Sequence, residues 1–441
     1  MLIGVTIAVL AVISIILRVT TKKSPKRTTE EPIDQTQEQE GKKGKKKGTK
    51  PPAATTTTTA QPSEQKSLKQ LIKQENLHKK QLKAAKKVDP NHPDYYHSFK
   101  GFSAPISGCD IDSDKRFAAV CALDSTFRVF KIPKRIDMKV EFPFTQQKID
   151  FYNPQAISIS DSAKYIAVAV DGANTIQIYQ YRDNPNPTTD DDQASGEIKF
   201  YFQFKNGIHK NTVNRVYINP KATFVVTAAT GGDDTMIKAW SLRGENLFTF
   251  NTSQIKTNNM TRSPDGRFLG VATWASEGEL LELKAAPDGT LKDLSKAMNL
   301  KGHKLETVDI AIDQKNERAV SLSKDKTIKL WNINVRYEVQ EDTKCLGTIE
   351  LTKHEDFKDA SISKIGTLSL YSMNDDNLMA LSCQNEIIIY SWKKQKVIQR
   401  IDNAHVEGAT ISNLMLVDFR GVLTVTSSGE DARVNIWKVH V

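Results

Sequence analysis

The sequence predicts an all-β fold in which seven short β-sheets form a closed ring, a β-propeller, preceded by an N-terminal tail. Three observations predict it. An Asp residue recurs six positions before an aromatic residue at several places after residue 101. Short runs rich in β-branched residues alternate with turn residues over the same region. No segment there has the apolar spacing of an amphipathic helix, so this region is expected to consist of strands and turns.

The clearest unit of the repeat runs from Gly302-His303 to Trp331. Asp325 lies 22 residues after His303 and six residues before Trp331. A Gly-His pair, an Asp and a strand that closes on Trp are typical of a blade of the WD-repeat type. Because one blade cannot bury both of its faces, this unit predicts further copies along the chain.

Six further units complete the expected ring. Three keep the Asp-to-aromatic interval: Asp124 to Phe130, Asp234 to Trp240 and Asp431 to Trp437. Three are degenerate: Asn174 to Tyr179 and Asn385 to Tyr390 lack the Asp, and Ser263 to Leu283 lacks the aromatic residue. With ~40–45 residues expected for each blade, residues 95–441 are predicted to form a seven-bladed WD40 β-propeller.

The two ends of the repeat region are expected to meet. The chain stops four residues after Trp437, so the last blade lacks an outer strand. The segment from Tyr95 to Phe102 resembles the start of a repeat, with Phe102 where His would stand. We expect it to supply the missing strand and to close the ring, because closure removes an exposed sheet edge.

The polar residues of the motif have two interpretations. His303, Ser321 and Asp325 could form a catalytic triad, or they could join Trp331 in a buried structural network. The second is favoured because imidazole can bridge a carboxylate and a hydroxyl group, and because a motif repeated around a ring indicates architecture. The same set is expected in two other blades. One consists of His405, Ser427, Asp431 and Trp437. The other consists of His209, Asp234 and Trp240, with either Thr227 or Thr230.

Motifs for catalysis, cofactors and metals are missing from the sequence. It contains no phosphate-binding glycine loop with Lys, no Gly-x-Ser-x-Gly and no His-Glu-x-x-His. The acidic run Asp190 to Asp192 lacks the Gly and Glu of a calcium-binding loop and is expected to be an exposed loop between blades. We therefore expect neither an enzyme nor a cofactor or metal protein.

Residues 1–20 are predicted to be a transmembrane anchor. Met1 to Leu17 carry no charge and are mostly apolar, and basic residues from Arg18 onward follow them. A cleaved signal peptide fits poorly because no basic residue precedes the apolar run and no small-residue cleavage site follows it. The position of the basic residues places the propeller in the cytosol. A short span suits the thin membrane of the endoplasmic reticulum, so a single-pass protein of that membrane is expected.

The tail between the anchor and the propeller is strongly basic. Residues 18–100 hold 20 Lys and Arg against 9 Asp and Glu. This excess accounts for the whole net charge of +10, so the propeller itself is nearly neutral. Residues 21–62 are predicted to be a disordered linker rich in Lys and Thr, and residues 63–88 a short basic helix. The densest charge lies at Lys42, Lys43, Lys45, Lys46 and Lys47. The tail is expected to be a solvated spacer, to bind anionic lipid headgroups, or to contact RNA or ribosomes weakly.

Cysteines and glycosylation sequons test the expected topology. The four cysteines form no Cys-x-x-Cys pair and are interpreted as reduced core residues of a cytosolic domain. They are Cys109, Cys121, Cys345 and Cys383. Asn251 and Asn259 lie in glycosylation sequons, and both are expected to be free of glycan.

The order of the parts resembles a known family. The stretches from Asn251 through Ser263-Pro264-Asp265-Gly266-Arg267-Phe268, and from Leu300 through Asp325-Lys326, are similar to the blades of the transducin beta-like protein 2 family. The resemblance implies a membrane protein of the endoplasmic reticulum with a cytosolic propeller. It also implies a role in stress signalling beside the membrane kinase of the unfolded-protein response, without catalytic activity. Members usually have a C-terminal extension beyond the position of Val441.

Three functions follow as hypotheses. The leading one is a non-catalytic, membrane-tethered scaffold, a monomeric propeller whose faces bind protein partners, including the stress kinase. The second is an exchange factor for a small GTPase of vesicle budding, although the known proteins of this kind carry their anchor after the propeller. The third is an RNA or ribosome tether acting through the lysine-rich tail. The degenerate blades around residues 149–181, 251–283 and 348–392 mark either reduced rigidity or drift in sequence.

Overall fold

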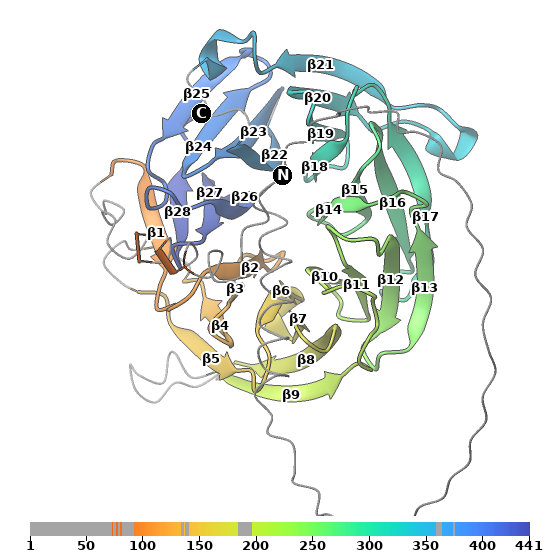
Figure 1. Cartoon of the computed structure of the whole chain (residues 1–441), viewed down its shortest axis with the longest axis vertical. Coiled ribbons are helices and arrows are strands. Elements are labelled where there is room, and N and C mark those ends of the chain that lie inside the picture. The colour runs from red at the N-terminus through yellow and green to blue at the C-terminus, as the bar shows by residue number, and fades with distance from the viewer. Residues whose placement is uncertain are drawn as a thin grey trace, which may run out of the picture.

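The computed structural model describes residues 92–133, 136, 141–183, 196–358, 364–373 and 375–441, with a few positions of the tail. These residues form seven four-stranded sheets arranged as blades around a central axis (Figure 1). Neighbouring strands in the sheets are antiparallel, as in the pairing of β2 (Ile106–Ile111) with β3 (Phe117–Ala122). The predicted seven-bladed, all-β propeller is therefore confirmed.

The first three blades follow one another along the chain. Blade 1 comprises β2, β3, β4 (Thr126–Lys131) and β5 (Phe144–Lys148). Blade 2 comprises β6 (Pro154–Ile159), β7 (Tyr165–Val170), β8 (Thr175–Arg182) and β9 (Glu197–Gln203), with the short 3-10 helix η1 (Asp161–Ala163) after β6. Blade 3 comprises β10 (Arg215–Ile218), β11 (Phe224–Ala228), β12 (Met236–Ser241) and β13 (Asn246–Asn251).

The next three blades repeat this order. Blade 4 comprises β14 (Thr257–Arg262), β15 (Phe268–Thr273), β16 (Gly278–Ala285) and β17 (Leu291–Leu300). Blade 5 comprises β18 (Thr307–Ile312), β19 (Arg318–Ser323), β20 (Thr327–Asn332) and β21 (Lys344–Glu350), with η3 (Tyr337–Val339) before β21. After η4 (Glu355–Phe357), blade 6 comprises β22 (Ile365–Met373), β23 (Asp376–Cys383), β24 (Glu386–Ser391) and β25 (Lys396–Ile401).

Blade 7 closes the ring with strands from both ends of the propeller. It comprises β26 (Ile411–Phe419), β27 (Val422–Gly429), β28 (Val434–Lys438) and β1 (Tyr95–Phe99). Phe99 is opposite Val434 and Ser98 is opposite Asn435 in the antiparallel pairing. The ring of Phe99 is buried and lies 4.8 Å from that of Phe130 in blade 1. The expected closing strand is confirmed: its backbone pairs with β28 inside blade 7, and its buried Phe99 ring packs against blade 1.

The burial of each strand follows its place in the blade. The second strand is sandwiched between two neighbours in its own sheet and between two adjacent blades, so both of its faces are apolar. All six residues of β3 are buried, and so are all six of β15. The outermost strands have one solvent-facing side, and β5 accordingly alternates between exposed and half-buried residues. Side chains alternate between the two faces of a strand, which explains this period of two.

The hydrophobic core is divided into seven clusters, each between two adjacent blades. One cluster joins blades 5 and 6 and includes Val320, Leu330 and Met379. Another joins blades 7 and 1 through Phe99 and Ile436. Each blade is thus stabilised chiefly by its two neighbours, as in other repeat proteins. The closing strand completes the last of these contacts.

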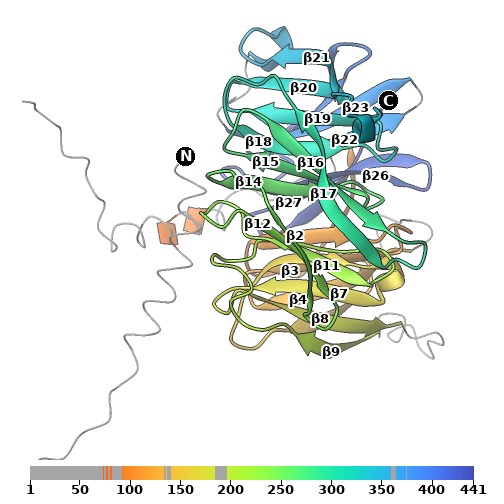
Figure 2. The same cartoon turned by 90° about the vertical axis from the view of Figure 1, so that its right-hand side faces the viewer.

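The disc has two faces with different loops. The upper face carries the loops between the second and third strands of each blade, and the loops that lead from each outermost strand to the next blade. The lower face carries the remaining loops, and Figure 2 shows the disc from its edge. Because β1 is an outermost strand, the chain enters blade 7 from the lower face. His440 Nε2 lies 2.9 Å from Asp94 Oδ1, so both ends of the described propeller meet there.

The predictions for the tail fall almost entirely outside the described residues. Residues 1–20 and 21–62 lie outside them. Within the predicted helix of residues 63–88, only Lys73, Asn76, Leu77, Lys80 and Gln81 are described, and each is helical and exposed. Among the residues that the structure describes, no helix has the length and apolar character needed to cross a membrane.

One expectation about a loop is wrong. The run Asp190 to Asp192 lies outside the described residues, but it is flanked by β8 and β9, which pair within blade 2. The run therefore belongs to an insertion inside one blade and does not connect two blades. The sequence alone did not show that the strands on either side of this run belong to the same blade.

Candidate functional site

The motif residues of blade 5 lie together beneath the upper face. His303 comes from the loop before the blade, Ser321 from β19, Asp325 from the turn after β19 and Trp331 from β20. His303 Nδ1 lies 3.2 Å from Asp325 Oδ2, and His303 Nε2 lies 2.7 Å from Ser321 Oγ. Trp331 Nε1 donates to Ser321 Oγ at 2.8 Å. The four side chains form one continuous hydrogen-bonded set.

The proton positions follow from the chemistry of the partners. An ionised Asp325 carboxylate only accepts, so His303 Nδ1 carries the hydrogen and donates to it. His303 Nε2 then accepts from the Ser321 hydroxyl, whose oxygen accepts the Trp331 N–H. Burial lowers the pKa of His303, which keeps the ring neutral and suits this arrangement.

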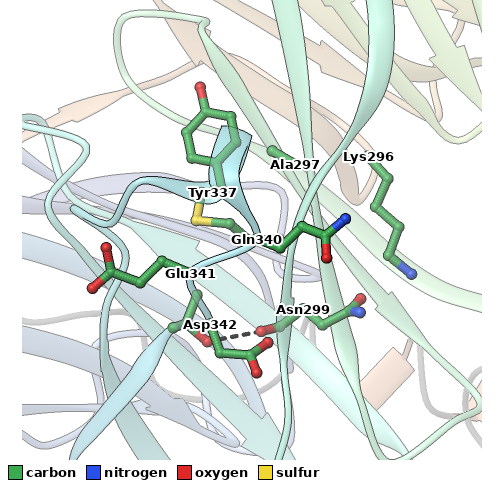
Figure 3. Close-up of a pocket in the computed structure, with 9 residues that line it drawn as sticks. Lys296, Ala297, Asn299, Tyr337, Gln340, Glu341 and Asp342 are labelled. Atoms are coloured by element: carbon green, nitrogen blue, oxygen red, sulfur yellow. Dashed lines mark hydrogen bonds between the residues drawn. The ribbon is translucent and has the colours of Figure 1, made fainter.

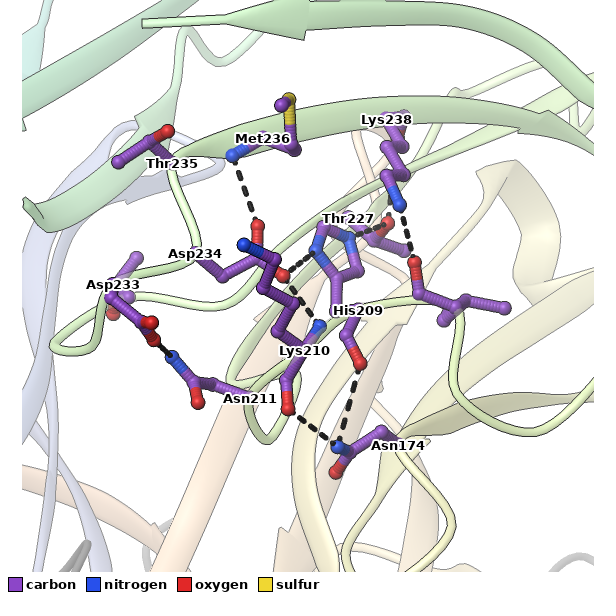
Figure 4. A network of polar contacts seen from close by, with 12 residues as sticks. Asn174, His209, Lys210, Asn211, Thr227, Asp233, Asp234, Thr235, Met236 and Lys238 are labelled. Carbon is purple, nitrogen blue, oxygen red and sulfur yellow. Dashed lines mark hydrogen bonds and ion pairs between the residues drawn. The ribbon is translucent and has the colours of Figure 1, made fainter. Parts of the chain in front are cut away.

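Blade 3 repeats the arrangement around His209 (Figure 4). His209 lies between Asp234 and Thr227, with its Nδ1 3.1 Å from the carboxylate and its Nε2 2.9 Å from the hydroxyl. Trp240 Nε1 donates to Thr227 Oγ1 at 2.8 Å. Thr230 instead bonds to Asn214, so Thr227 is the member of the set.

The same four-residue arrangement is present in blade 7. His405 Nδ1 lies 2.8 Å from Asp431 Oδ1, and its Nε2 lies 2.9 Å from Ser427 Oγ. Trp437 Nε1 donates to Ser427 Oγ at 3.3 Å. The three sets lie in blades 3, 5 and 7, each beneath a different part of the upper face. We call them the polar sets.

The polar sets fix loops and offer no reactive group to solvent. Ser321 and Ser427 have 0% of their surface exposed, so neither hydroxyl can reach a substrate. The carboxylates also hold the loops, since the backbone N–H of Lys304 donates to Asp325 at 2.8 Å. Burial by itself raises the pKa of Asp234, but hydrogen bonds from His209 and from the N–H groups of Met236 and Lys210 outweigh it and lower the pKa to about 2. The arrangement is that of a structural network.

The other four blades replace the hydroxyl by an aliphatic residue. Register places Val120, Val168, Val271 and Leu381 at the position of Ser321. Blade 1 keeps its Asp124, but this carboxylate accepts from Ser103 and Thr126. Without a hydroxyl, His and Trp would have no shared partner. These blades therefore lack the bridging hydroxyl at this level, although the turn of blade 1 is still held by the bond from Thr126 to Asp124.

A second polar network lies around the central axis, and the sequence motifs gave no sign of it. Arg262 on β14 reaches across to Asp110 on β2, and its Nη2 donates to Asp110 Oδ1 at 2.6 Å. Asp110 Oδ2 also accepts from the Ser158 hydroxyl at 2.7 Å. The guanidinium of Arg262 stacks over the Tyr217 ring at 4.9 Å. Blades 1, 2, 3 and 4 are thus linked through polar side chains at their innermost strands.

On the other side of the axis, Asp309 joins three blades. Arg215 Nε donates to Asn259 Oδ1 at 2.7 Å, and Asn259 Nδ2 donates to Asp309 Oδ1 at 2.8 Å. Asp309 Oδ2 accepts from the backbone N–H of Leu368 at 2.8 Å. Burial raises the pKa of Asp309 to about 6 despite these hydrogen bonds. The only signal available in the sequence was polar residues at positions where an inner strand should be apolar.

Asn259 is therefore unsuitable as a test of topology. Its side chain is 9% exposed and is bonded to Arg215 and Asp309. A folded propeller would not present it to a glycosylating enzyme in any compartment. Asn251, by contrast, is exposed at the end of β13.

A surface pocket of about 270 Å³ lies between β17 and the loop that carries η3 (Figure 3). Its wall is joined by a hydrogen bond from Thr343 Oγ1 to the Asn299 carbonyl at 2.7 Å. Its carboxylates are neutralised, since Glu341 pairs with Lys344 at 3.3 Å and Asp342 with Lys301 at 3.2 Å.

The cysteines are only partly as expected. Cys121 and Cys383 are buried, and burial raises the pKa of Cys121 to about 12. Cys345 is exposed on β21, the outermost strand of blade 5, so its interpretation as a core residue is wrong. An outermost strand has a solvent side, and the sequence did not reveal on which side Cys345 lies. Among the described residues, no group of His, Cys, Asp and Glu is arranged to hold a metal.

Comparison with known proteins agrees with the geometry. The family described as "WD domain, G-beta repeat" matches residues 94–131 and 294–332. The first range contains β1 to β4, and the second contains most of β17 and all of β18, β19 and β20. Transducin beta-like protein 2 of Homo sapiens is 24% identical over 340 residues, which cover 76% of this chain and 71% of that protein. The protein of the same name from Mus musculus is 25% identical over 274 residues, covering 61% and 59%. The resemblance predicted from the sequence is confirmed by both relatives.

Proposed function

We propose that this protein is a non-catalytic scaffold that recruits partner proteins at the cytosolic face of the endoplasmic reticulum membrane. The observation that carries the proposal is the use of the motif side chains. In blades 3, 5 and 7 the polar sets are turned inward and hold the loops of the upper face, as the bond from Lys304 N–H to Asp325 illustrates. Rigid loops lose little conformational entropy on binding, so they suit recognition.

The membrane part of the proposal comes from the sequence of the tail. Residues 1–17 are uncharged and apolar, and basic residues follow them. In the structure the chain enters the propeller at the lower face, where Asp94 contacts His440. Confinement to a membrane raises the effective concentration of bound partners without any new contact.

The signalling part of the proposal rests on the resemblance to the transducin beta-like 2 relatives. That resemblance implies stress signalling beside the membrane kinase of the unfolded-protein response, so this kinase is the first partner to examine. The basic tail, with Lys42 and Lys43 in its densest part, would lie next to anionic headgroups and add to membrane attraction.

Proximity labelling tests the scaffold proposal. A labelling enzyme fused after Val441 should mark proteins of the endoplasmic reticulum surface, including the stress kinase, in the full chain. Removal of residues 1–27 should abolish this neighbourhood. The proposal is wrong if the labelled proteins are the same with and without these residues, or if they belong to another compartment.

Glycosylation of Asn251 tests the orientation. A cytosolic propeller never meets the glycosylating enzyme, so the chain should show no change in mobility on glycosidase treatment. An Asn251→Gln variant provides the control, because any shift that it abolishes must come from this residue. A glycosidase-sensitive shift in the unaltered chain would overturn the cytosolic placement.

The strong positive charge of the tail favours one second candidate, an RNA or ribosome tether. Lysine-rich segments bind phosphate backbones with an affinity that falls as salt rises. Replacing Lys42, Lys43, Lys45, Lys46 and Lys47 by Gln should then remove salt-sensitive co-sedimentation with ribosomes. Unchanged co-sedimentation of this variant would exclude the tether.

A further inference from the structure

An exposed apolar cluster lies on the upper face where blades 4 and 5 meet. Trp274, in the turn after β15, is 42% exposed, Ile255 is 76% exposed and Leu305 is 54% exposed. Backbone contacts place them side by side. The Trp274 N–H donates to the carbonyl of Lys256, the neighbour of Ile255, and the Thr307 N–H donates to the Ala275 carbonyl. We call Ile255, Trp274 and Leu305 the apolar cluster.

Two lysines flank the central ring of this cluster. Lys256 Nζ lies 6.0 Å from the centre of the Trp274 ring, and Lys324 Nζ lies 5.8 Å from it. Lys256 precedes blade 4 and Lys324 belongs to blade 5, so the ammonium groups come from loops on either side of the ring. Lys324 pairs with Glu306, whereas Lys256 forms no ion pair with any described residue. The lysines repel each other, and burial together with Lys256 lowers the pKa of Lys324.

The loops that carry the cluster are held in place by hydrogen bonds. Asn258 Nδ2 donates to the Thr273 carbonyl, to Glu306 Oε2 and to the Thr307 carbonyl, which ties the loops of blades 4 and 5 together. The Ser323 hydroxyl donates to the Leu305 carbonyl at 3.0 Å. The blade 5 polar set holds the same loop through the N–H of Lys304. The surface is preorganised, which lowers the entropic cost of binding.

Further lysines surround the cluster. Lys304 and Lys326 are exposed in the same two loops of blade 5. The nearby Asp325 carboxylate is engaged in the blade 5 polar set, and Glu306 is buried against Lys324 and Asn258. Glu277, in the same turn as Trp274, is a third carboxylate of these loops, so four lysines face three carboxylates and this part of the upper face has a small excess of positive charge. Trp is enriched at protein–protein interfaces and among the residues that dominate their binding energy.

We propose that the apolar cluster, with Lys256 and Lys324, is the docking site for an acidic segment of a partner protein that carries one large apolar side chain. The apolar side chain packs on Trp274 between Ile255 and Leu305. Flanking Asp or Glu side chains of the partner pair with the two ammonium groups. The inference rests on the proposed scaffold function and names the chemistry of the partner that this face selects.

The observations favour a peptide over a nucleic acid. Single-stranded nucleic acids require successive aromatic platforms along a basic groove. Here the neighbours of Trp274 are aliphatic, Ile255 and Leu305, which suit an apolar side chain.

A random peptide display library, selected on the full chain in mild detergent, tests the proposal. Enriched peptides should contain several acidic residues around one aromatic or large aliphatic residue. Trp274→Ala should weaken their binding by about tenfold or more, as expected for a central interface residue. The Lys256→Glu, Lys324→Glu double variant should weaken it and remove its salt dependence. Phe200→Ala, which removes an exposed aromatic ring from β9, is the matched control and should bind like the unaltered chain.

Each other result overturns the docking site. Selected peptides that are basic or neutral, or that bind the Trp274→Ala variant unchanged, would refute it. So would tight binding of single-stranded oligouridine or phosphatidylserine vesicles that depends on Trp274 while acidic peptides fail to bind. Circular dichroism of each variant establishes that it is folded. If the docking site is refuted but proximity labelling still depends on residues 1–27, the scaffold function stands and another surface binds the partners.

Discussion

Removal of one hydroxyl group should destabilise the whole propeller. Ser321 accepts the Trp331 N–H at 2.8 Å and donates to His303 Nε2 at 2.7 Å, and its side chain is fully buried. Ser321→Ala leaves both ring nitrogens without this partner. An unsatisfied buried polar group costs ~1–3 kcal/mol, so the two together should cost about 2–6 kcal/mol of unfolding free energy.

The loss is measurable as a shift in melting temperature. For a propeller of this size the expected decrease is about 3 to 8 °C, because the entropy of unfolding grows with chain length. Thermal unfolding followed by near-UV circular dichroism reports on the tryptophans of the blades. Ser276→Ala is the matched control, since this loop hydroxyl forms no hydrogen bond with the described residues, and its melting temperature should not change.

A double-mutant cycle separates the hydrogen bond from other effects. Trp331→Phe removes the donor, so the Ser321 hydroxyl loses one partner and the ring leaves a small cavity. In the double variant Ser321→Ala, Trp331→Phe, one of the two orphaned groups no longer exists. The double variant should therefore be more stable than the sum of the single effects predicts, by about 1 kcal/mol. Additive effects, or a Ser321→Ala chain that melts like the unaltered one, would refute the structural role of the polar set.

Other consequences of the structure can be measured in the same way. Phe99→Ala should destabilise the fold by about 3–5 kcal/mol, because the closing strand buries this ring, and an unchanged melting temperature would contradict ring closure by β1. Asp234 has its pKa lowered to about 2, so its stabilising effect is complete above the unfolded value near 4 and is lost as pH falls toward 2. The loss should be about 2–3 kcal/mol and absent in Asp234→Asn; equal acid sensitivity of the two chains would contradict it. Cys345 should react with a maleimide in the native state while Cys121 reacts only after unfolding, and mass spectrometry showing equal labelling would contradict the burial assigned to them.

The sequence alone determined what repeats along the chain. The spacing of His303, Asp325 and Trp331 identified a blade, and the copies fixed the number of blades. The pairing of the segment from Tyr95 to Phe102 with the last blade was also expected, because the last blade lacked an outer strand of its own. Each of these features lies within one repeat or joins the first and last repeats, so a periodic pattern in the sequence reveals it. In blade 3, spacing could not separate Thr227 from Thr230, because the extra Gly231 and Gly232 obscured the alignment.

Only the tertiary structure decided what the ring brings together. Arg262 and Asp110 are 152 residues apart, and they meet because blades 1 and 4 share the central axis. Trp274 and Lys324 come from different blades, and the closure of the ring places them in one cluster. The exposure of Cys345 could be found only from the structure, because it depends on which side of the outermost strand β21 faces solvent. A repeat pattern specifies each blade, whereas such contacts depend on the geometry of the closed disc, which the linear sequence encodes only through the packing of neighbouring blades.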